Sequence, residues 1–128
     1  MSELVRAVEI YASVHFAIMG LSHFFRPLAW VQLFELLRAQ GTSGVFAHGF
    51  LSLFFGAMIV AFHNVWSGPG TALTVVGWLY VAKSAACFLA PKFQLLSLGR
   101  VSNDRKWELQ FAGAAYLLLA SWLTAHLI

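Results

Sequence analysis

Residues 45–62 decide the fold, and they read VFAHGFLSLFFGAMIVAF. The stretch carries no Asp, Glu, Lys or Arg over its 18 positions, and its polar side chains are those of His48 and Ser52. A helix of that length rises about 27 Å, which is close to the hydrocarbon thickness of a bilayer. The stretch therefore predicts a membrane-spanning helix.

Working outward, three further apolar runs predict spans at about 8–25, 71–90 and 107–127. Pro27 and Pro91 follow the first and third runs, where a helix is expected to stop. The predicted fold class is therefore all-α, an integral membrane four-helix bundle that forms a single transmembrane domain over residues 1–128.

The composition excludes a soluble domain. The chain has 128 residues, of which 60% are hydrophobic and only 10% charged, whereas about 25% charge is usual for soluble domains. Four spans use about 80 residues, so no room remains for a separate soluble domain.

Residues 27–40 have a different, amphipathic pattern. Apolar side chains recur there at helical spacing, at Leu28, Val31, Phe34 and Leu37. Pro27 suits the first turn of such a helix, and Gly41 suits its end. We predict an interfacial helix between the first two spans, with Trp30 among the lipid headgroups.

The basic residues predict the orientation. One face of the membrane receives six of the eight Lys and Arg residues, namely Arg26, Arg38, Lys92, Arg100, Arg105 and Lys106. The other face has only Arg6, and Lys83 lies within a span. Because cytoplasmic connections carry the excess of Lys and Arg, we expect an inner (cytoplasmic) membrane protein with both termini outside. The net charge of +3 then indicates anionic lipid headgroups as partners, not nucleic acid.

Lys83 is the most costly residue of the predicted spans, since a lysine near a span centre costs about 2.5–3.5 kcal/mol on insertion scales. We expect it to face a cavity, the bundle interior or a partner subunit, with Tyr80 alongside. The alternative is a side chain that extends to the cytoplasmic headgroups. Other helices offer three acceptors, Glu9, Glu108 and Tyr116.

The histidines permit two interpretations. His23 and His48 fall at a similar depth, and we expect them within reach of each other or of Arg26. Since His48 and His63 lie about 22 Å apart along one helix, His23 with His48 and His63 with His126 are possible ligand pairs for b-type haem. The other interpretation is that these rings form hydrogen bonds at helix ends and between helices. No H-E-x-x-H pair occurs, so we predict no metal site.

The sequence from Gly20 to Pro27 has the form G-x-x-H-F-x-x-P and resembles that of the DoxX-like group of small four-helix bacterial membrane proteins. The run FHNVW at 62–66, followed by Gly77 and Trp78, is similar to a pattern of other small bacterial membrane proteins. The resemblance implies a four-helix fold and a link to respiratory or sulfur metabolism, and it transfers no catalytic residue.

Nothing in the sequence points to a catalytic nucleophile or a phosphate loop, so we expect a protein that is not an enzyme. We predict an accessory subunit of a membrane complex, or a self-associating bundle, that binds a lipid-like or small molecule without a cofactor. Its expected contact residues are Lys83, His23, His48, Arg26 and Tyr80. The alternatives are an electron-transfer anchor linked to haem or quinone, and a small transporter that uses Lys83. The lack of a sequence repeat speaks against the transporter.

Two stripes of small residues complete the pattern. Ser52 and Gly56 form one, and Ala82, Ala86 and Ala90 form the other. Small residues at this spacing let helices approach closely in lipid, and we expect one stripe to contact another subunit.

Overall fold

The computed structural model describes residues 2–128, and over that range the chain forms helices and no strand. The predicted all-α class is confirmed. The elements, in chain order, are α1 (Glu3–Phe25), α2 (Pro27–Ala39), α3 (Thr42–Phe62), α4 (Thr71–Leu89), α5 (Pro91–Leu98), the short 3-10 helix η1 (Asn103–Arg105) and α6 (Lys106–Leu127).

Three helices, α1, α3 and α4, are long and apolar enough to cross a membrane. They correspond to the first three predicted spans. Helix α6 has 22 residues and is as long, but polar side chains such as Gln110 and His126 make it less apolar. Its crossing of the membrane stays a prediction.

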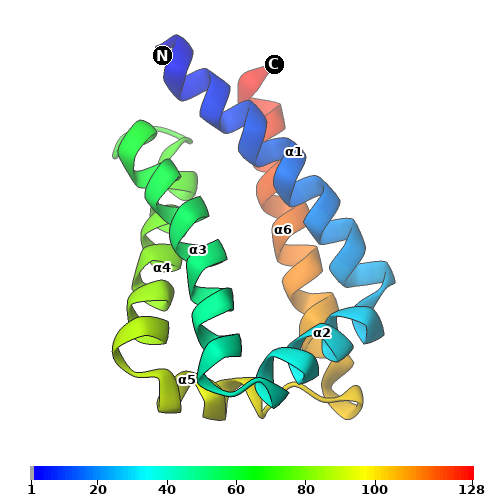
Figure 1. Ribbon diagram of the computed structural model, residues 1–128. Coiled ribbons are helices and arrows are strands. Elements are labelled where there is room, and N and C mark those ends of the chain that lie inside the picture. The colour runs from blue at the N-terminus through cyan, green and yellow to red at the C-terminus, as the bar shows by residue number, and fades with distance from the viewer. Residues whose placement is uncertain (1) are drawn as a thin grey trace.

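The long helices pack as two pairs, α1 with α6 and α3 with α4 (Figure 1). Glycines bring the helices of each pair together. A Cβ atom built on Gly113 of α6 lies 2.7 Å from the carbonyl oxygen of Gly20 in α1, and one built on Gly56 of α3 lies 2.9 Å from that of Gly77 in α4. The backbones touch at these points, so each pair is a tight unit.

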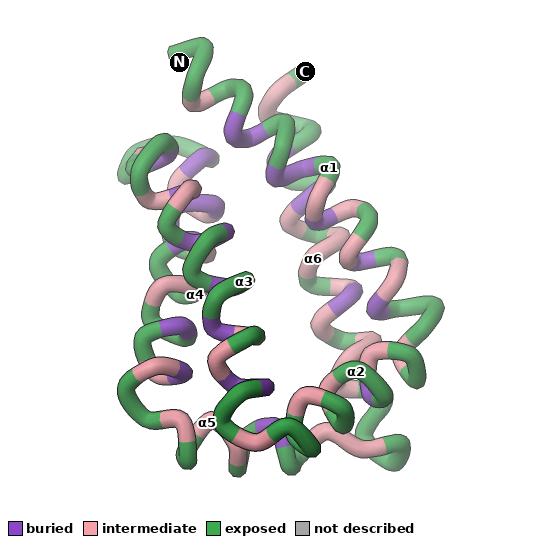
Figure 2. The backbone as a smooth tube through the Cα atoms, viewed as in Figure 1, coloured by how far each residue is buried: buried purple, intermediate pink, exposed green. Residues whose placement is uncertain are grey.

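The two pairs meet at the end of the molecule that holds both termini. There the Trp122 indole of α6 donates a hydrogen bond to the carbonyl oxygen of Pro69, at 3.0 Å. The pairs diverge toward the other end, which α2 and α5 close (Figure 1). Buried residues accordingly lie on the faces that the helices turn toward one another, while outward faces are exposed (Figure 2).

Several helix boundaries differ from the prediction. Helix α1 begins five residues early, because the Ser2 hydroxyl accepts a hydrogen bond from the Val5 amide and caps it. Helix α3 begins at Thr42, since Gly41 with φ 64° makes the turn after α2. The amphipathic helix α2 ends within one residue of its predicted end.

The polar segment 93–106 contains the end of a helix that the sequence did not predict, α5. Ala90 stands before Pro91 and adopts φ −137° and ψ 61°, so the chain breaks there and restarts at the proline. Arg26 before Pro27 has nearly the same conformation, with φ −127° and ψ 49°. At both places, the residue before proline ends a long helix and the proline begins a short one.

The two halves of the chain therefore repeat one order of elements: a long helix, a break before proline, a short helix and a second long helix. The packing repeats as well, because α2 packs on α6 and α5 packs on α3. The sequence shows no internal repeat, whereas the order of the helices does repeat. Side chains differ between the halves, which hid the repeat from the sequence.

Candidate functional site

A cavity of about 410 Å³ separates the two helix pairs on the side that α2 closes. Its walls are mostly aromatic and aliphatic, and α1, α2, α3, α4 and α6 all contribute to them. The residues of its lining that carry a polar group are Tyr11, His15, His23, Trp30, His48, Ser52, Tyr80, Lys83 and Tyr116. A mostly apolar cavity with a few convergent polar groups is typical of a small-molecule site.

Helices α1 and α3, which both line one side of this cavity, touch only sparsely. Its lining on that side includes Tyr11 of α1 and Leu51 and Phe54 of α3, and the last two are 74% and 71% exposed.

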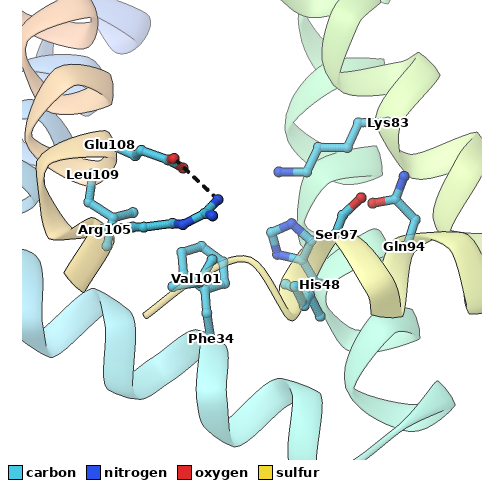
Figure 3. Close-up of a pocket in the computed structure, with 10 residues that line it drawn as sticks. Phe34, His48, Lys83, Gln94, Ser97, Val101, Arg105, Glu108 and Leu109 are labelled. Atoms are coloured by element: carbon cyan, nitrogen blue, oxygen red, sulfur yellow. Dashed lines mark ion pairs between the residues drawn. The ribbon is translucent and has the colours of Figure 1, made fainter. Parts of the chain in front are cut away.

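A second cavity, of about 280 Å³, adjoins the first and shares Phe34, His48 and Lys83 with it. Its other polar residues are Gln94 and Ser97 of α5, Arg105 of η1 and Glu108 of α6. In Figure 3, Lys83 and His48 point into it from one side, and Arg105 and Glu108 face them from the other. The joined space is thus mostly apolar in its larger part and more polar near α5.

Lys83 itself has no ion-pair partner among the described residues. Glu108 lines the same cavity, but its Oε1 is 3.6 Å from Arg100 and 3.9 Å from Arg105. Glu9 lies elsewhere in the fold. The ammonium group of Lys83 is therefore left toward the open cavity, where an added acceptor can reach it.

His23 and His48 both line the larger cavity, but no hydrogen bond joins them in the part of the chain that is described. The Nδ1 of His23 is 2.7 Å from the carbonyl oxygen of Met19 and donates to it, and the ring stacks on Trp30 at 4.0 Å. His48 packs its ring edge-on against Phe34. Each histidine is thus fixed by a neighbour other than the expected one.

Tyr80 lies where we expected it, beside Lys83, and its hydroxyl is 3.2 Å from that of Tyr116. This contact joins α4 to α6 across the cavity. Arg26 is exposed at the end of α1 and lines neither cavity. The structure therefore brings together Lys83, His23, His48 and Tyr80, and leaves Arg26 apart.

His63 and His126 lie at the other end of the molecule, around the buried carboxylate of Glu9. The Oε1 atom of Glu9 is 3.0 Å from Nε2 of His126 and 3.3 Å from Nε2 of His63. A haem held by two histidines needs its ring between the imidazoles, and the Glu9 carboxylate occupies that place. As they lie, the two histidines do not fit a haem. Among residues 2–128, moreover, no group of three His, Cys, Asp or Glu side chains is arranged to hold a metal ion.

The two small-residue stripes have different surroundings. Ser52 and Gly56 are buried inside the bundle, with Gly56 against α4. Ala82 of α4 and Ala90, which follows the helix, are exposed, and Ala86 between them is half-buried. Contact of one stripe with another subunit stays a prediction.

Comparisons with known proteins add nothing to this geometry. No protein-family model matches the sequence, and neither a curated protein nor a solved structure matches it. The resemblance to the DoxX-like group stays a prediction.

The sequence did not indicate that Glu9 is the partner of two histidines, although a carboxylate inside an apolar run was a signal that it needs partners. Nor did it indicate His15, whose ring stacks on Phe55 at 4.3 Å in the wall of the larger cavity. Contacts with other helices determine the surroundings of Glu9 and of His15, and such contacts are not visible in the sequence.

Proposed function

We propose that this chain is a four-span protein of the inner membrane, with both termini outside, that binds a lipid-like molecule between its helix pairs. The single observation that carries the proposal is the joined cavity. Its apolar part opens toward the acyl chains, and the unpaired ammonium group of Lys83 lies at its polar end. An amphiphile placed there buries its tail among aromatic rings and its head beside Lys83.

The head of the ligand is anionic or accepts hydrogen bonds. Lys83 offers three N–H donors, and His48 and Gln94 lie in the same lining. Lys83 is six residues from the end of α4, about 9 Å along the helix, which suits a headgroup that lies just inside the membrane. A single-chain carboxylate or an isoprenoid with a polar head meets these requirements.

Binding of laurate to the purified protein in nanodiscs tests the proposal, with dodecylamine as the ligand of equal chain length and opposite charge. We expect laurate to bind more tightly than dodecylamine, and Lys83→Met to weaken laurate binding about tenfold, equivalent to about 1.4 kcal/mol. Lys92→Met is the matched control, because Lys92 is exposed on α5 and lines neither cavity. Equal binding of the two ligands, or of laurate to both variants, contradicts the proposal.

A short-chain ubiquinone is a third ligand for the same measurement. Binding of the quinone in place of laurate favours the electron-transfer anchor, and a visible spectrum of protein purified from native membranes decides on haem. A role as an accessory subunit adds a partner through the exposed alanines of α4, and copurification from native membranes tests it.

A small transporter is a second candidate, which the repeated order of elements favours, because many transporters consist of two structural repeats with the binding site between them. Liposomes that contain a fluorescent anionic lipid distinguish the two functions. A transporter accelerates the exchange of that lipid between leaflets, and Lys83→Met slows the exchange again. A binding protein leaves the rate unchanged.

A further inference from the structure

At the end that holds both termini, a second polar cluster consists of Glu9 of α1, His63 at the end of α3, Thr74 of α4 and His126 of α6. Glu9 is 1% exposed, His63 is fully buried, and His126 is 19% exposed. The cluster lies far along α1 from the Lys83 cavity and lines neither of the two cavities described above. It therefore needs an explanation of its own.

The hydrogen bonds of Thr74 fix where one proton of His63 is. The Thr74 hydroxyl donates its only hydrogen to the carbonyl oxygen of His63, at 2.8 Å, and accepts the amide N–H of Val65, at 3.0 Å. The Nδ1 of His63 is 3.0 Å from the same hydroxyl oxygen and must therefore be the donor of that contact. A neutral His63 ring then has its proton on Nδ1 and a lone pair on Nε2.

That lone pair faces a carboxylate oxygen. Nε2 of His63 lies 3.3 Å from Oε1 of Glu9 and has no hydrogen-bond partner in the described structure. Two buried lone pairs at this distance repel each other, and an unpaired buried charge is costly. One extra proton between the two atoms removes both penalties, since it makes either an imidazolium beside a carboxylate or a carboxylic acid that donates to the ring.

The remaining neighbours fit a cluster that holds this proton. His126 satisfies the carboxylate from α6, at 3.0 Å, and a Cβ atom on Gly70 would lie 3.0 Å from Oε1 of Glu9, so a side chain there would crowd the carboxylate. Arg6, the nearest other charged residue of α1, turns its guanidinium to the carbonyl oxygen of Leu127. From α4 the hydroxyl of Thr74 contacts the cluster, and this group does not titrate.

We infer that Glu9, His63 and His126 form a proton-binding site in which one proton is held between Glu9 and His63 and is reached from the outer surface past His126. A cavity of about 360 Å³ beside the cluster supplies that route, and Glu9 and His126 line it together with Ser2 and Ser67. Because Glu9 and His126 belong to one helix pair and His63 to the other, the proton fastens the two pairs where they meet.

The sign of the pH dependence follows from this proton. The proton inferred between Glu9 and His63 is bound by the folded cluster and not by the unfolded chain. Stability therefore falls as the pH rises, because folding takes up a proton. Glu9→Gln removes the carboxylate that shares this proton. The amide nitrogen of the glutamine can still donate to His63, and its oxygen can still accept from His126.

Thermal unfolding of the full chain in detergent, measured at several values between about pH 6 and pH 9, tests the inference. For the natural sequence we expect the midpoint to fall by about 5 °C or more over this range. Glu9→Gln and His63→Gln abolish that fall, whereas His126→Gln keeps it, because a glutamine there still donates to Glu9. Glu35→Gln, on an exposed residue of α2, is the control for loss of one negative charge and keeps the fall.

Two results overturn the inference. One is a fall of the same size in Glu9→Gln as in the natural sequence. The other is the loss of the fall in His126→Gln while His63→Gln keeps it, which places the proton on the wrong histidine. If Glu9→Gln does not fold, the two histidine variants still decide between these outcomes.

Discussion

The two polar clusters of this protein lie at opposite ends of the same cleft between helix pairs, and they differ in how their charges are satisfied. The carboxylate of Glu9 lies between the imidazole rings of His63 and His126 and is almost inaccessible. Lys83 faces an open cavity without any partner in the described chain. Lipid offers no hydrogen bonds, so buried polar groups need partners within the protein or from a ligand. Glu9 has its partners within the chain, whereas Lys83 has no ion-pair partner among the described residues.

The largest expected effect concerns which end of the molecule lies outside the cell, because labelling from outside is all or none. A cysteine at Ser67 belongs to the same end as the Glu9 cluster, and one at Ser102 belongs to the Lys83 end. We expect a reagent that does not cross membranes to label intact cells at position 67 and not at 102. Cys87 is fully buried, so the natural sequence gives a blank background. Labelling at 102 alone reverses the topology and the assignment of both clusters.

The next effect compares the clusters directly. Glu9→Ala leaves His63 and His126 without their shared acceptor, and breaking a buried charged contact costs about 3–5 kcal/mol. Lys83→Leu removes a charge that has no partner, so we expect stability in the absence of ligand to stay the same or increase. Unfolding of both variants in mild detergent measures the difference. A loss in Lys83→Leu as large as that in Glu9→Ala shows that Lys83 is a structural residue.

The sequence was sufficient for the features that depend on one helix at a time. The apolar runs located α1, α3 and α4, and the spacing of Leu28, Val31, Phe34 and Leu37 located α2, because each pattern is local. Helix α5 was missed, since segment 93–106 was treated as a polar connection and Pro91 as an end rather than a beginning. The same dipeptide geometry had been interpreted correctly at Pro27, where an amphipathic pattern followed.

Partners across helices could not be predicted in the same way. The depth of His23 and His48 was consistent with their common cavity, but the rotation of each helix decides whether two rings meet, and that rotation depends on glycines such as Gly20 and Gly113. Glu9 was noted as an acceptor for Lys83, whereas the packing of α1 on α6 turns it to His63 and His126. Tertiary packing therefore determined the clusters, and the sequence determined only their members.

A third effect tests whether the pairs are as tight as the glycines indicate. A Cβ atom on Gly113 meets the Gly20 carbonyl oxygen at 2.7 Å and the Phe24 amide at 2.8 Å. Backbone atoms cannot move aside easily, so we expect Gly113→Ala to cost about 1–3 kcal/mol and to separate α1 from α6 locally. Ala115→Leu, on the exposed face of α6, adds more volume without such a contact and is the control. Equal stability of the two variants contradicts the close approach.

The smallest expected effect concerns the contact that joins the two pairs across the Lys83 cavity. The hydroxyl groups of Tyr80 and Tyr116 are 3.2 Å apart, and a hydrogen bond of this kind contributes about 1 kcal/mol. Since both rings line the cavity, a ligand that enters displaces or strengthens this contact, and the energy of the contact then depends on whether the cavity is occupied.

A double-mutant cycle with Tyr80→Phe and Tyr116→Phe isolates the coupling energy between the two hydroxyl groups. We expect a coupling energy of about 1 kcal/mol without laurate and a different value when laurate is saturating, with the same cycle in a Lys83→Met background unchanged by laurate. A coupling energy that laurate leaves unchanged in the natural sequence shows that the ligand does not reach the tyrosines. The ligand would then occupy only the part of the cavity between Lys83 and α5.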